Sequence, residues 1–150
     1  MTHPTDDRSH LEVLYRQDCL DLLANQPVGR VGFRDGDEVI VLPVNYILHD
    51  DAVVFRTSEG SKLTAAVQGQ RLAFEVDEVD SVHRVGWSVL VRGDATLIDD
   101  QELIATYEMQ LLFPWSRTEK DFWVRLPLDR ISGRRIRTVA EENRMDPRTR

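Results

Sequence analysis

Short apolar runs separated by tight turns constrain the fold of this chain more than any other feature. Residues 28–33 (VGRVGF) and 38–48 (EVIVLPVNYIL) each have the character of a β-strand, and the Asp-Gly pair between them is typical of a tight hairpin turn. The same reasoning predicts strands at 52–57, 71–79 and 86–98. Residues 121–139 predict one or two more strands, with a break near 127–129.

Three short helices are predicted between these strands. The first spans 19–26, with Asp18 as its N-cap and Pro27 at its end, and the second spans 61–68 and is closed by Gly69. The third spans 99–112, and its apolar stripe consists of Leu103, Tyr107, Met109 and Leu111. Many short antiparallel strands without regular βαβ alternation predict a mainly β, α+β fold, built as a small barrel with Greek-key or meander connections. We expect one domain over 11–139, with flexible tails at 1–10 and 140–150.

Charge and composition argue against several classes of function. The 150 residues have a formal net charge of -7, whereas binding to nucleic acid requires a basic face that neutralises many phosphates. No apolar run approaches the roughly 20 residues that cross a bilayer, and the N-terminus lacks the features of a signal peptide, so we expect a cytoplasmic protein without a membrane partner. The single cysteine, Cys19, permits no intramolecular disulfide, and the scattered histidines give no metal-ligand spacing. No Walker A or GxSxG motif is present, so no catalytic residue is assigned.

The stretch RTSEGSKL, residues 56–63, is the strongest candidate for a binding site. It combines the hydroxyls of Thr57 and Ser61, the start of a predicted helix and the ammonium of Lys62, and such groups together suit a phosphate monoester. Lys62 is one of only two lysines among 19 basic residues, so a compact point charge stands here in a chain that otherwise uses arginine. The alternative is that Ser61 only caps the helix and that Lys62 lies on its solvated face.

Four other segments leave a structural and a functional interpretation open. Pro43 lies within a strand-like run, which predicts a sheet edge or a bulge whose backbone groups could contact a flat heteroaromatic ring. Trp87 could wall a pocket or a subunit interface, or be a core aromatic. The acidic residues of 77–80 (DEVD) could bind a cation or form a solvated rim. The arginine-rich run 131–139 (ISGRRIRTV) is predicted to be a charged edge strand, with the lining of a cleft as the alternative.

Five segments resemble those of a known family when they are taken in order: QPVGRVGF, PVNYIL, VVFRTSEGSKL, FEVDEVD and GWSVLVRGDA. Their order and spacing, over about residues 11–137, are similar to the pyridoxamine 5'-phosphate oxidase-like family of flavin-binding split barrels, in particular its short actinobacterial-type branch. The resemblance implies a six-stranded antiparallel split β-barrel, a homodimer, and one FMN in each of two clefts between the subunits.

The resemblance also implies a cofactor site. In it, RTSEGSKL holds the FMN phosphate, PVNY lies along the isoalloxazine ring, the segment 87–89 reaches the cofactor from the partner subunit, and two residues near the C-terminus close the cleft. The implied residues are Pro43, Val44, Asn45, Tyr46, Arg56, Thr57, Ser61, Lys62, Leu63, Trp87, Ser88, Val89, Trp123 and Arg125. A charge-assisted hydrogen bond to a phosphate contributes about 1.5 to 3 kcal/mol, so loss of Lys62 is predicted to weaken FMN binding by about one to two orders of magnitude.

The implied function is that of a flavin-dependent oxidoreductase, in which bound FMN exchanges hydride or electrons with a small organic substrate. The C-terminal sequence does not match that of the oxidase after which the family is named, which argues against oxidation of vitamin B6. Two alternatives use the same fold. One is a reductase that depends on a deazaflavin coenzyme, whose acidic tail would need basic residues such as Arg30, Arg34 and Arg71. The other is a non-catalytic module that binds or senses flavin or haem.

Overall fold

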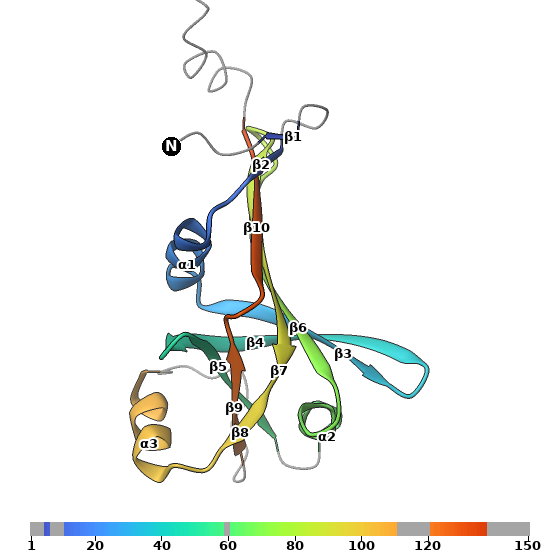
Figure 1. Cartoon of the computed structure of the whole chain (residues 1–150), viewed down its shortest axis with the longest axis vertical. Coiled ribbons are helices and arrows are strands. Elements are labelled where there is room, and N and C mark those ends of the chain that lie inside the picture. Colours follow the sequence, from blue (N-terminus) through green and yellow to red (C-terminus); the bar gives the residue numbers. More distant parts are fainter. Residues whose placement is uncertain (1–4, 7–10, 59–60, 111–120, 138–150) are drawn as a thin grey trace, which may run out of the picture.

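The computed structural model describes residues 5–6, 11–58, 61–110 and 121–137 (Figure 1). The strands in these ranges are β1 (Thr5–Asp6), β2 (Leu11–Val13), β3 (Val28–Asp35), β4 (Glu38–His49), β5 (Ala52–Ser58), β6 (Arg71–Asp80), β7 (Val85–Asp94), β8 (Thr96–Ile98), β9 (Asp121–Pro127) and β10 (Ile131–Ile136). The helices are α1 (Arg16–Ala24), α2 (Lys62–Val67) and α3 (Gln101–Gln110). None of these helices is long and apolar enough to cross a bilayer.

All strand pairs in the sheet are antiparallel, and the order is β1-β2-β10-β7-β6-β3-β4-β5-β9-β8. The long strand β4 changes partner along its length, because Glu38–Asn45 pairs with β3 and Tyr46–His49 pairs with β5. The sheet curls so that β7 and β9 come close again, and the Arg92 amide of β7 donates to the carbonyl of Arg130, which lies between β9 and β10, at 3.0 Å. The predicted mainly β class and split barrel are confirmed.

The sheet contains ten described strands where six were predicted. The predicted strand at 86–98 divides at Ala95, a buried residue between β7 and β8, and the run 121–139 divides between β9 and β10, close to the predicted break. The short strands β1 and β2 extend the sheet beyond β10. Runs of two or three residues carry too little periodicity to be recognised, and β1 falls within the segment predicted as a tail. The remaining tail residues, 1–4, 7–10 and 140–150, lie outside the described ranges.

Helix α1 packs its buried residues Cys19 and Leu23 against the sheet. The helix can approach β10 closely because Gly133 has no side chain: a Cβ there would lie 2.6 Å from Cys19 Sγ. The predicted N-cap, Asp18, is wrong. The helix begins at Arg16 with Tyr15 as N-cap, and the Cys19 amide donates to the Tyr15 carbonyl at 3.1 Å, which places Asp18 inside the first turn.

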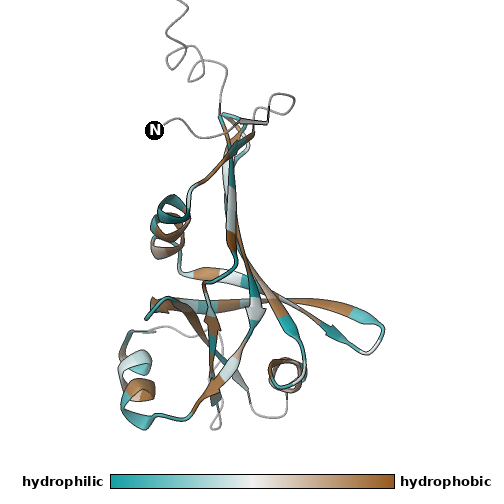
Figure 2. Cartoon of the chain, in the orientation of Figure 1, coloured by the Kyte–Doolittle hydropathy of each residue, from teal (hydrophilic) through white to brown (hydrophobic). Residues whose placement is uncertain are grey.

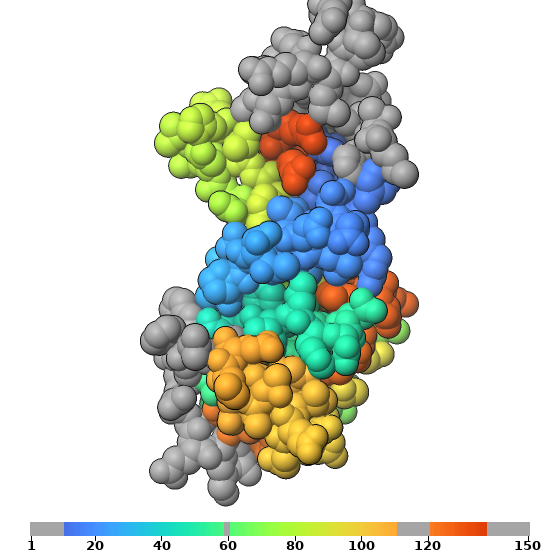
Figure 3. Space-filling view, turned by 90° about the vertical axis from the view of Figure 1, so that its left-hand side faces the viewer, coloured from blue at the N-terminus to red at the C-terminus, as the bar shows by residue number. Residues whose placement is uncertain are grey.

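Helix α3 covers the outer face of β4, β5 and β9, on the side of the sheet away from the main core. Tyr107 of α3 packs with Val54 and Trp123 in a small cluster of its own, with Leu103 at its edge. Met109, predicted to share this stripe, is 76% exposed, because it lies on the opposite side of the helix from Tyr107. The predicted partner Leu111 lies outside the described residues. Figure 3 shows α3 in orange directly beside the strands β4 and β5.

Candidate functional site

The end of β5 and the start of α2 bring together the hydroxyls of the segment RTSEGSKL. Thr57 Oγ1 lies 2.8 Å from Ser61 Oγ, which accepts a hydrogen bond from the Thr64 amide at 3.1 Å. Thr64 Oγ1 also donates to the Ser58 carbonyl at 2.8 Å. Ser61 is therefore the N-cap of α2, as the structural interpretation proposed, and Thr64 is a member of this cluster that sequence reasoning missed. Because α2 has only six residues, any ligand here would be held mainly by side chains.

Both cations of this segment already face a carboxylate. Arg56 Nε lies 3.3 Å from Asp121 Oδ2 of β9, and Lys62 Nζ lies 2.8 Å from Asp35 Oδ2 of β3. The two cations differ in exposure, since the Arg56 side chain is 13% exposed and that of Lys62 is 63% exposed. Arg56 Nη2 is buried without a hydrogen-bond partner, although its guanidinium lies 5.8 Å from the Trp123 ring centre. The segment therefore contains, in Arg56 Nη2, one buried donor that a ligand or a rearranged side chain could satisfy.

The PVNY segment lies on β4 at the point where this strand changes partner. Pro43 is on the part of β4 that pairs with β3 alone among the described strands, so its position on a sheet edge agrees with the prediction. Alternation along the strand turns Pro43 and Asn45 toward the outer face, while Val44 and Tyr46 face the core. The Tyr46 hydroxyl donates to the Leu23 carbonyl of α1, and burial raises the pKa of Tyr46. A ligand on the outer face could therefore reach Tyr46 only through its backbone.

The two predicted site residues of β9, Trp123 and Arg125, lie on the same outer face as Arg56, but they have different surroundings. Trp123 pairs with Arg56 in register and is 1% exposed beneath α3. Arg125 lies two residues further along and donates from Nη2 to the Asp50 carbonyl at 3.0 Å, in the turn between β4 and β5. Leu63, on α2, is 2% exposed and belongs to the main core. In the single chain, Trp123 and Leu63 are thus buried in two different hydrophobic clusters and present no exposed side chain to a ligand.

The segment 87–89 lies on β7, far from α2 within the same chain (Figure 1). Ser88 is exposed on the outer face, Val89 is fully buried, and Trp87 is half-buried on the face turned toward α1. The structure therefore brings Pro43, Asn45 and Arg56 to one face of a single chain, but it does not bring Trp87 or Ser88 to them. This separation is compatible with the expectation that 87–89 acts in the site of a partner subunit.

The acidic residues of 77–80 belong to separate contacts. Asp77 Oδ1 accepts from Arg30 Nη1 at 2.9 Å, and Glu78 Oε2 accepts from Gln26 Nε2 at 2.9 Å. Asp80 accepts hydrogen bonds from backbone amides of the β6–β7 turn, and these bonds hold its pKa below the ordinary range. Among the described residues, no three His, Cys, Asp or Glu side chains gather as a metal site would require.

Comparisons with known proteins agree with the fold and with the order of these segments. Residues 15–135 match the family model described as pyridoxamine 5'-phosphate oxidase. Uncharacterized protein Rv0080 of Mycobacterium tuberculosis is 36% identical over 133 residues, which cover 85% of this chain and 86% of that one. The structure of the FAD binding protein from Mycobacterium smegmatis has 33% identity and a TM-score of 0.67, covering 84% of this chain and 98% of that chain. The conserved protein of unknown function DIP1874 from Corynebacterium diphtheriae has 29% identity and a TM-score of 0.70, covering 86% and 100%. The chain therefore belongs to the pyridoxamine 5'-phosphate oxidase family.

Proposed function

We propose that this protein binds a flavin through the phosphate of its FMN moiety at the corner between β5 and α2. The observation that carries the proposal is the contact between the Thr57 and Ser61 hydroxyls at this corner, with the cations of Arg56 and Lys62 on the residues next to them in the chain. A phosphate dianion accepts hydrogen bonds from such cations and hydroxyls. A relative with 33% identity is an FAD binding protein, and FAD contains the same phosphate.

The residues at the corner fit such a group in their chemistry. Arg56 Nη2 is a buried donor without a partner, and Lys62 is exposed and can turn from Asp35 toward a ligand. Asp35 and Asp121 would remain close to the phosphate, so they moderate the affinity that the cations provide. The Pro43–Asn45 edge of β4 lies on the same outer face and offers backbone groups to a flat ring, with Val44 fixed in the core below.

We further propose that the protein is an oxidoreductase acting on a small organic substrate. A bound flavin supplies hydride and electron transfer, so the protein needs no acid-base pair of its own for that chemistry. The task of this chain is to hold the phosphate at Arg56 and Lys62 and to place the ring along Pro43–Asn45. The net charge of -7 supports a small-molecule substrate rather than nucleic acid, and the single cysteine is compatible with the cytoplasm.

A homodimer with two cofactor sites at its interface is part of this proposal. The outer face beside Pro43 has exposed apolar side chains, with Val39 and Val41 exposed by 76% and 63%. The β6–β7 hairpin adds Val79 and Val82, which are exposed by 71% and 83%. Figure 2 shows a hydrophobic stretch along the projecting β3–β4 arm before its hydrophilic tip. A second subunit on this face would bury these side chains and could bring its own segment 87–89 to the site.

The first experiment is an absorbance spectrum of the purified protein, recorded before and after incubation with FMN, FAD, the deazaflavin coenzyme or haem and removal of free ligand. We expect flavin bands at about one flavin per subunit. Turnover of an added electron donor then distinguishes an enzyme from a module that only binds or senses the cofactor. Retention of no flavin would contradict the proposed site, and retention of haem alone would favour the haem-binding alternative.

A deazaflavin coenzyme remains a second candidate because one specific feature favours it. Arg71, one of the basic residues expected to hold an acidic tail, lines a cavity of about 230 Å³ whose other charged residues are Arg92, Arg130, Asp94 and Asp129. Both arginines face a carboxylate, since Arg30 Nη1 lies 2.9 Å from Asp77 Oδ1 and Arg71 Nε lies 3.8 Å from Asp94 Oδ1. If the purified protein retains the deazaflavin coenzyme but neither FMN nor FAD, the result favours the deazaflavin-dependent reductase over the flavin-dependent oxidoreductase.

A further inference from the structure

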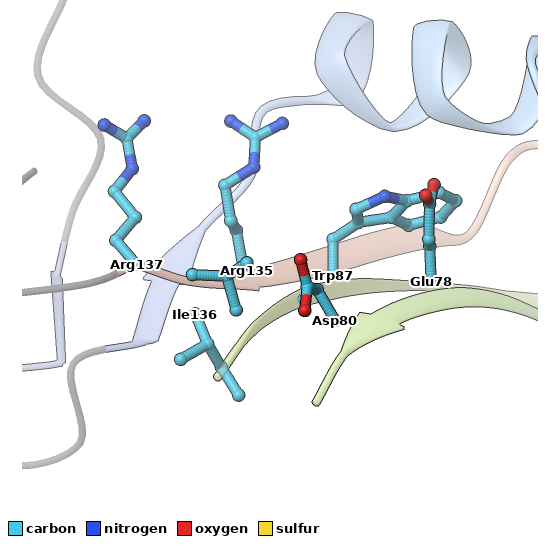
Figure 4. A pocket seen from close by; sticks show the side chains of 8 residues that line it. Glu78, Asp80, Trp87, Arg135, Ile136 and Arg137 are labelled. Atoms are coloured by element: carbon cyan, nitrogen blue, oxygen red, sulfur yellow. The ribbon is translucent and has the colours of Figure 1, made fainter. Parts of the chain in front are cut away.

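A pocket of about 490 Å³ lies on the face of β6, β7 and β10 that is turned toward α1 (Figure 4). Its lining includes Glu78 of β6, Trp87 of β7, Arg135 of β10, and Arg137, which follows the end of β10. Figure 4 shows the two arginines extending to the same side of β10, whereas Ile136 points the opposite way. The prediction that this run is an edge strand is wrong, because β10 pairs with both β2 and β7. Its arginines line a pocket instead.

Glu78, Trp87 and Arg135 form a row across three neighbouring strands. The register pairs Glu78 with Trp87 and Trp87 with Arg135, so the three side chains share one face. Adjacent strands lie about 4.8 Å apart, which places the backbones of Glu78 and Arg135 about 10 Å from each other with the indole between them. The two opposite charges are therefore held on either side of an aromatic surface.

The charged groups that line this pocket differ in how far other side chains already engage them. Gln26 Nε2 donates to Glu78 Oε2 at 2.9 Å and so steadies the carboxylate from one side. Arg137 is engaged with the buried carboxylate of Glu12 through two hydrogen bonds, which tie β10 to β2. Arg135 differs, because its guanidinium makes no hydrogen bond or ion pair within the described part of the chain. Arg135 is thus the cation that the pocket offers.

We propose that this pocket binds a flat aromatic ring that has a carboxylate at one edge and an amino group at the opposite edge. The Arg135 guanidinium pairs with the carboxylate, the ring packs against the indole of Trp87, and the amino group donates to Glu78. The residues at the corner between β5 and α2 are not part of this pocket, and of its lining only Trp87 also belongs to the segment 87–89 that is proposed to reach the cofactor of a partner subunit. The contacts proposed for Arg135 and Glu78 do not rest on flavin binding.

Calorimetric titration of the full chain with 4-aminobenzoate, benzoate and aniline tests the proposal. We expect saturable binding of 4-aminobenzoate with a Kd on the order of 1 mM, as for a small fragment. Benzoate lacks the amino group and aniline lacks the carboxylate, so each should bind about fivefold more weakly. If 4-aminobenzoate shows no saturable binding at about ten times the expected Kd, the proposal is overturned.

A matched pair of variants assigns the binding to this face. Arg135→Gln and Arg134→Gln remove the same charge from neighbouring residues of β10 whose side chains face opposite sides of the sheet. We expect Arg135→Gln to weaken binding of 4-aminobenzoate at least about tenfold, and Arg134→Gln less than about twofold. Glu78→Gln should weaken binding of 4-aminobenzoate but leave that of benzoate unchanged. Equal weakening by both arginine variants would overturn the proposal, because it would reflect overall charge alone; thermal melts check that each variant is folded.

Discussion

Replacement of Lys62 by alanine tests the proposed phosphate site most directly. A hydrogen bond from a cation to a phosphate contributes about 1.5 to 3 kcal/mol, but the exposed position of Lys62 favours the lower end of that range. The ammonium must also leave Asp35, 2.8 Å away, which offsets part of its gain from the phosphate. We therefore expect Lys62→Ala to weaken FMN binding about tenfold, the lower end of what sequence alone predicted.

Asp35→Asn provides the matched control, because it removes the competing charge and keeps the cation. The variant frees the ammonium and eliminates a carboxylate near the phosphate, so FMN should bind about two- to fivefold more tightly. Fluorescence titration of FMN against the apoprotein measures both variants under the same low-salt conditions. An affinity of Lys62→Ala within about twofold of the parent, with Asp35→Asn also unchanged, would refute the assignment of the phosphate to this corner.

Four further predictions concern packing, pH and assembly. Gly133→Ala should lower the free energy of unfolding by about 1 to 3 kcal/mol, because the new methyl group overlaps Cys19 Sγ, and combination with Cys19→Ala should recover part of the loss in urea titrations. Tyr46→Phe should cost about 1 kcal/mol in the same assay, since it removes the hydrogen bond to α1. Burial and the neighbouring carboxylate of Asp77 raise the pKa of Glu75. The free energy of unfolding of the parent, relative to that of Glu75→Gln, should therefore be highest at low pH and fall as pH rises through the raised pKa. A difference that does not change with pH would contradict this prediction. If the protein forms the proposed homodimer, Val41→Asp should shift it toward monomer in sedimentation velocity, and a dimer that this variant leaves unchanged would place the interface elsewhere.

The local elements of this protein were accessible from sequence because their signals are local. Alternation at 28–33 and 38–48, with Asp-Gly between them, predicted the β3–β4 hairpin, and Ser61 predicted the start of α2. The hydroxyls and cations of residues 56–63 were likewise visible, because they are neighbours in the chain. Boundaries were less accurate beside tertiary contacts, as at the start of α1, where the Leu14 amide donates to the Gly133 carbonyl of β10 and the helix begins before Asp18.

The sequence by itself determined the mainly β class and the corner between β5 and α2, since these depend on residues a few positions apart. Only the tertiary structure decided which charges face each other: Asp35 reaches Lys62 from β3, and Asp121 reaches Arg56 from β9. It also placed β10 inside the sheet and aligned Arg135 with Trp87 across two strands. The physical reason is that strand pairing joins segments distant in sequence, and its register follows from burial of a whole face rather than from any local signal.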